Sequence, residues 1–177
     1  MRIKEVLFDA KEPTVYCESF VYEPSNIEEE KLGYLFMIGR IRNVPENSFY
    51  LINLLASRIK REYYGNLSRS PSQAIEVALK KGNEVLKENE ERINWLGNLD
   101  FFVAAVSQRK IYLTCIGKIK AFIIREEKDE QNVIDLIKDL ISERDVLFPF
   151  SIILTGSIKK NDILIFPPQI YFQKRDY

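Results

Sequence analysis

Apolar residues follow two spacings along the chain, and these spacings separate segments that favour strands from segments that favour helices. Short runs of β-branched and aromatic residues, each ended by turn-forming residues, predict β-strands. Such runs lie at Ile3–Ala10, Thr14–Pro24, Leu32–Ile41, Leu99–Val106, Ile111–Glu126, Phe150–Gly156 and Asp162–Pro168. Ser107–Lys110 separates two of these runs and predicts a β-hairpin turn, whereas the polar segment Ser25–Lys31 predicts a solvated loop.

Three segments instead repeat their apolar residues every three or four positions, the spacing of one face of an amphipathic helix. The first covers Pro45–Tyr64 and the third covers Gln131–Ile141. The second begins at Ser70, where Pro71 suits the first helical position and Gln73 completes a capping box. Apolar stripes of this kind are typical of core packing rather than of a cofactor site.

The order of these elements predicts the fold class. Strands are followed by two helices, a strand hairpin, a helix and further strands, and this grouping favours α+β layers built on mainly antiparallel sheets. A chain of 177 residues is long enough for one globular domain with a sizeable core, so we expect a single domain over residues 1–177. No internal repeat or low-complexity segment interrupts it.

The composition excludes several classes of function. The chain contains no histidine, which removes Ser-His-Asp and Cys-His catalysis and the commonest zinc ligand. Lys and Arg together number 26, and Asp and Glu together also number 26. The protein therefore has no net charge that would attract it to nucleic acid or to a membrane surface. We therefore expect neither of these partners.

The cysteines and the apolar runs indicate the compartment. Cys17 and Cys115 lie far apart in apolar, strand-like runs, and two buried free thiols in a reducing compartment fit this pattern better than a disulfide. No apolar run reaches the roughly 20 residues that span a bilayer, and no signal segment opens the chain. A cytoplasmic protein is the expectation.

Several stretches resemble one family, the metal-dependent PPM (type 2C) protein serine/threonine phosphatases. The stretch "GYLFMIGRIRN" (Gly33–Asn43) resembles the family's G-L-F-A-V-A-D-G-M-G-G strand and loop. The stretch "LDFFVAAVSQRKIYLTCIGKIKAFIIR" (Leu99–Arg125) resembles T-T-L-V-A-A-L followed by L-x-V-A-N-V-G-D-S-R-A-Y-L-x-R. The stretch "GSIKKNDILIFPPQI" (Gly156–Ile170) resembles the G-D-x-L-L-L strand that leads into S-D-G. The resemblance implies a layered α-β-β-α sandwich over about Leu32–Gln169.

The same resemblance implies that the family's metal site has lost its ligands. The family binds two divalent cations through aspartates, and these positions fall here on Gly39, Lys118 and Gln169. Hard cations need several oxygen ligands, which glycine and lysine do not supply. We therefore expect no catalytic residue, no metal and no cofactor. The family's last aspartate has no counterpart before Tyr177, so a fold truncated at its C-terminus and a chain that continues further both remain open.

Basic residues stand where the resemblance would place acids and cations. Arg40, Arg42, Lys118 and Lys120 could together hold a phosphate or an acidic side chain of a partner without metal. The alternative is that they are ordinary solvated side chains, which is the usual place of lysine and arginine.

Two classes of function follow. The first is a non-catalytic, phosphatase-like module that binds a protein partner or a second copy, for instance by pairing at an exposed strand edge such as Asp162–Pro168. The second is an enzyme, either a divergent phosphatase or another hydrolase on a related two-layer sandwich. Its candidate carboxylates are Asp100, Asp129, Asp145 and Asp162, although Asp100 at a strand start also fits a turn or capping residue. A hydrolase with an N-terminal nucleophile is disfavoured because Met1-Arg2 offers no Thr, Ser or Cys.

Overall fold

Two antiparallel sheets form the centre of the molecule. The computed structural model describes residues 3–4, 14–127, 130–138 and 149–167. The larger sheet has the strand order β1-β2-β3-β4-β7, where β1 is Val15–Tyr22, β2 Tyr34–Arg42, β3 Leu99–Ser107, β4 Lys110–Ile116 and β7 Leu154–Ser157. The smaller sheet has the order β6-β5-β8, where β5 is Phe122–Glu127, β6 Glu130–Asp135 and β8 Ile163–Ile165. All the ladders are antiparallel, which confirms the predicted α+β class with antiparallel sheets.

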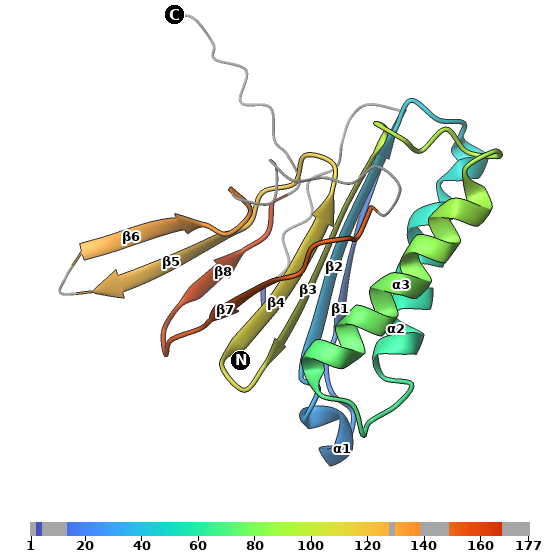
Figure 1. Cartoon of the computed structure of the whole chain (residues 1–177). Helices are drawn as coiled ribbons and strands as arrows, with labels where there is room; N and C mark the ends of the chain where they lie inside the picture. Colours follow the sequence, from blue (N-terminus) through green and yellow to red (C-terminus); the bar gives the residue numbers. More distant parts are fainter. Residues whose placement is uncertain (1–2, 5–13, 128–129, 139–148, 168–177) are drawn as a thin grey trace, which may run out of the picture.

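Helices cover one face of the five-stranded sheet (Figure 1). These are α2 (Tyr50–Tyr63), preceded by the 3₁₀ turn η1 (Glu46–Ser48), and α3 (Pro71–Asn89). The predicted capping box is confirmed, since the Ser70 side chain accepts a hydrogen bond from the Gln73 main chain and the Gln73 side chain accepts one from Ser70. None of the helices in the described ranges is long and apolar enough to cross a membrane.

The five-stranded sheet has an apolar core on each face. Because side chains alternate along a strand, Leu35, Met37 and Ile41 of β2 face α2 and α3, whereas Phe36 faces the three-stranded sheet. Phe166, just after β8, packs against Phe36 and Phe102, with ring centroids 6.0 and 4.8 Å away. The described residues thus build a helical layer, a five-stranded sheet and a three-stranded sheet, which are three of the four layers expected.

The helix predicted over Gln131–Ile141 is wrong for the part that the structure describes. Residues 130–135 form β6, which pairs with β5 from Phe122↔Asp135 to Glu127↔Glu130. An isolated helix of this length is marginal, whereas a hairpin with the preceding strand satisfies the main chain at once. Residues 139–141 lie outside the described residues.

Two other local predictions have clear outcomes. The Ser107–Lys110 turn is confirmed, and Gln108 and Arg109 adopt φ values of 47° and 63°, the left-handed pair that a two-residue hairpin turn requires. The segment Ser25–Lys31, predicted as a loop, contains the one-turn helix α1 (Ile27–Glu30), because the Asn26 side chain caps the main-chain N–H of Glu29. Of the strand predicted at Ile3–Ala10, only residues 3–4 are described.

Candidate functional site

The two faces of β2 separate Gly39 from the arginines beside it. A Cβ atom at Gly39 would lie 2.7 Å from Cγ2 of Ile52 and 3.0 Å from the ring of Phe101, both in the core under the helices. A carboxylate at position 39 would therefore find no room, and it would point away from Arg40 and Arg42, which are on the opposite face. Arg40, the next residue of β2, is the one that belongs to the polar cluster around Asp100.

Asp100 is the centre of this polar cluster. It lies on β3 directly opposite Arg40 of β2, and it is 1% exposed. Its Oδ2 accepts a hydrogen bond from Nη1 of Arg42 at 2.5 Å, and Nε of Arg40 lies 3.9 Å from the same oxygen. Burial of a carboxylate is costly unless it is paired and hydrogen-bonded. Arg42 supplies the hydrogen bond, and Arg40 adds a second positive charge at a longer distance.

The loop after β4 completes the environment of Asp100. The main-chain N–H of Lys118 donates to Asp100 Oδ1 at 2.7 Å, while the Lys118 side chain is exposed. Gly117 has a φ of 75°, and a Cβ atom there would lie 2.0 Å from the same oxygen, so only glycine allows this close approach. Arg42 is also fixed, since its Nη2 donates to the main-chain oxygen of Gly97 at 3.1 Å.

This arrangement is poorly suited to bind a divalent cation. Both oxygens of Asp100 already accept hydrogen bonds, and two arginines place positive charge beside them. Magnesium and manganese need several free oxygen ligands and would be repelled by the guanidinium groups. Within the described part of the chain, no three Asp, Glu, Cys or His residues gather as a metal-binding group.

Thiol chemistry is disfavoured at the same place. Cys17 of β1 lies directly opposite Arg40 and is a free cysteine. Burial raises the pKa of the Cys17 thiol above its usual range, although the positive charge of Arg40 acts in the other direction. A reactive cysteine needs a lowered pKa, so Cys17 fits an inert packing residue.

The remaining candidate residues do not join the cluster. Lys120 forms an ion pair with Asp135 of β6 at 3.0 Å. Asp162 accepts two hydrogen bonds from the Arg125 guanidinium, at 2.9 and 2.7 Å, and a third from the main-chain N–H of Lys159 at 2.8 Å. The Arg125 hydrogen bonds lower the pKa of the Asp162 carboxyl, which indicates a structural ion pair at the β7–β8 connection. Asp129, Asp145 and Gln169 lie outside the described residues.

Sequence reasoning missed the central place of Asp100. The sequence offered it as a candidate carboxylate of an enzyme or as a turn or capping residue at a strand start, but it is the second residue of β3, and its carboxylate is hydrogen-bonded to Arg42 and to the main chain of Lys118. A signal was available, because Arg40 and Arg42 at i, i+2 spacing share one strand face and buried cations require an acidic partner. The sequence did not show which of the acids meets them.

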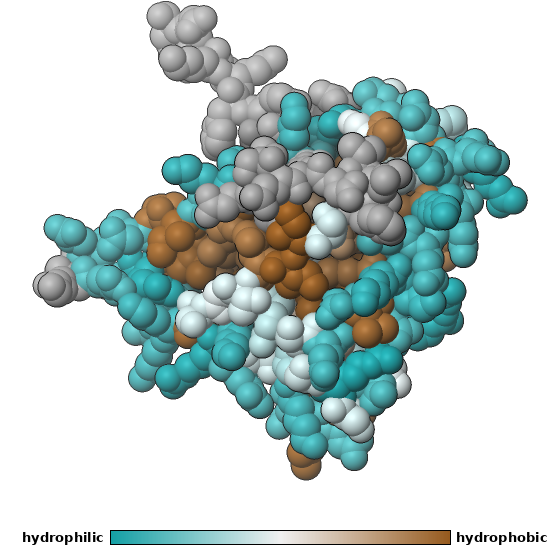
Figure 2. Space-filling view, in the orientation of Figure 1, coloured by the Kyte–Doolittle hydropathy of each residue, from teal (hydrophilic) through white to brown (hydrophobic). Residues whose placement is uncertain are grey.

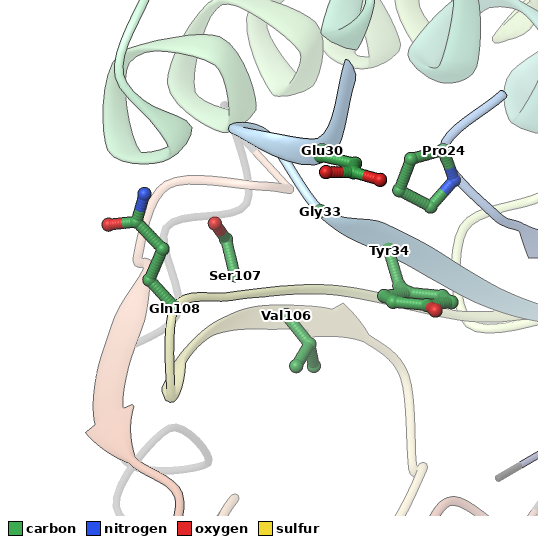
Figure 3. A pocket seen from close by; sticks show the side chains of 7 residues that line it. All are labelled: Pro24, Glu30, Gly33, Tyr34, Val106, Ser107 and Gln108. Carbon is green, nitrogen blue, oxygen red and sulfur yellow. The ribbon is translucent and has the colours of Figure 1, made fainter. Parts of the chain in front are cut away.

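Two surface depressions lie away from the cluster. One, of about 320 Å³, is lined by Pro24, Glu30, Gly33, Tyr34, Val106, Ser107 and Gln108. Figure 3 shows the Glu30 carboxylate beside Pro24, whereas Gln108 points away from the other side chains. The other, of about 690 Å³, lies between α3 and residues 150–155. Neither contains Arg40, Arg42 or Asp100, so neither extends the polar cluster into a substrate pocket.

Comparison with known proteins gives similarity at the level of structure. No family model and no curated protein matches the sequence. Among solved structures, PppA, described as a key regulatory component of T6SS in Pseudomonas aeruginosa, is 13% identical, with a TM-score of 0.52 over 86% of this chain and 76% of that chain. The serine/threonine phosphatase of S. agalactiae is 11% identical, with a TM-score of 0.48 over 85% and 78% of the two chains. The Mycobacterium tuberculosis phosphatase PstP/Ppp is 10% identical, with a TM-score of 0.43 over 84% and 76%.

The PppA match carries the fold assignment, because its TM-score exceeds 0.5, and at 13% identity it concerns the fold alone. It agrees with the resemblance of the strand and loop motifs and with the antiparallel layers described above. This chain therefore has the fold of the PPM-type serine/threonine phosphatases, with a buried arginine–aspartate cluster on the strands and loop where that resemblance places metal ligands.

Proposed function

We propose that this protein is a non-catalytic, phosphatase-like domain that acts as a protein-binding or regulatory module. The observation that carries the proposal is the Arg42–Asp100 ion pair, with Arg40 and the Lys118 main chain around the same carboxylate. Phosphatases of this fold need carboxylates that are free to bind cations, as the resemblance implies. Here the buried Asp100 carboxylate is paired with positively charged arginine side chains of the protein itself.

The cluster also weighs against capture of an external anion by Arg40 and Arg42. Both guanidinium groups lie close to Asp100, so a phosphate would have to compete with a buried carboxylate for them. Lys118 keeps an exposed side chain, which fits a solvated residue. The arginines therefore support a structural role more than a phosphate-binding one.

The binding part of the proposal is supported by exposed apolar surface on the three-stranded sheet. Ile124 pairs with both Val133 and Ile163, and Phe122 pairs with Ile165, so these five residues share its outer face. Val133 is 66% exposed and Ile163 is 56% exposed. Figure 2 shows hydrophobic surface over this sheet and hydrophilic surface at the tip of the β5–β6 hairpin. Contiguous exposed apolar surface is characteristic of interaction sites.

PppA is described as a regulatory component, and a regulatory role for this chain would agree with that description of PppA.

The alternative is a divergent phosphatase or another hydrolase on the same fold. Of its candidate carboxylates, Asp100 and Asp162 are both engaged in ion pairs with arginine, while Asp129 and Asp145 lie outside the described residues.

The test is isothermal titration of Mn²⁺ and Mg²⁺ into the purified chain, with p-nitrophenyl phosphate and phosphopeptide hydrolysis assayed on the same sample. We expect neither a binding heat nor turnover, while an active phosphatase of this fold, run in parallel, shows both. Stoichiometric binding of two cations together with turnover would overturn the proposal. Loss of both cation binding and turnover in Asp100→Asn, with circular dichroism showing that the variant is folded, would then identify Asp100 as a ligand in spite of its arginine partners.

A further inference from the structure

We draw no further inference here: the strongest candidate, the exposed apolar outer face of the three-stranded sheet around Ile124, Val133 and Ile163, already supports the proposed function, and nothing in the part of the chain that the structure describes shows what covers it.

Discussion

At the scale of single residues, Asp100 determines what the cluster between β2, β3 and the loop after β4 can do. A carboxylate that is 1% exposed is costly to bury without hydrogen-bond partners, and Arg42 makes the shortest contact to it. Gly117 leaves room for Oδ1 of Asp100, and the main-chain N–H of Lys118 donates a hydrogen bond to that oxygen. The same carboxylate could serve a metal only if these contacts were broken.

Replacement of Arg42 should therefore be costly. We expect Arg42→Ala to lower the free energy of unfolding by roughly 3 kcal/mol, because it leaves a buried carboxylate with a weaker partner. Urea denaturation followed by circular dichroism measures the change. Lys80→Ala is the matched control, since its ion pair with Glu76 is on the surface of α3 and is worth less than about 1 kcal/mol. Equal effects of the two variants would contradict a buried structural ion pair.

The Asp162–Arg125 pair predicts a pH dependence of stability. Hydrogen bonds from Arg125 lower the pKa of Asp162 in the folded chain, so its contribution is fully present above the unfolded pKa of about 3.9. That contribution is lost as the pH falls through the lowered, folded value. We expect Asp162→Asn to reduce the loss of stability between about pH 4 and pH 2, measured by urea denaturation at each pH. An unchanged pH profile would contradict this assignment.

At the scale of elements, the sequence predicted structure correctly where neighbouring residues in the chain mark the beginning of a helix or form a turn. The capping box at Ser70 and Gln73 and the turn at Gln108–Arg109 were both predicted, because their hydrogen bonds join residues close in sequence. β6 was not, since Val133, Ile134 and Ile137 fit a helical spacing and only the ladder to β5 decides between the two structures.

The cap of α3 can be tested directly. We expect Ser70→Ala to lower the free energy of unfolding by about 1 kcal/mol, because the main-chain N–H of Gln73 loses its partner. Ser72→Ala, an exposed residue in the same turn, is the control and should change stability by less than about 0.5 kcal/mol. A comparable loss in both variants would show that the cap contributes nothing specific.

At the scale of the whole molecule, the fold and the chemistry of the phosphatases are separable. The two sheets and the helical layer resemble PppA without high sequence identity, since burial patterns and strand order suffice for the architecture. Catalysis requires particular oxygen ligands at particular positions.

The sequence by itself determined the class of the fold, most of the strands, the two long helices and the absence of histidine, because these follow from spacing and composition along the chain. It also predicted that positions such as Gly39 and Lys118 cannot bind a cation. Only the tertiary structure decided that Arg42 meets Asp100, 58 residues away, and that residues 130–135 pair with β5. Contacts of this kind depend on which strands become neighbours, and that choice is made by the packing of the whole chain.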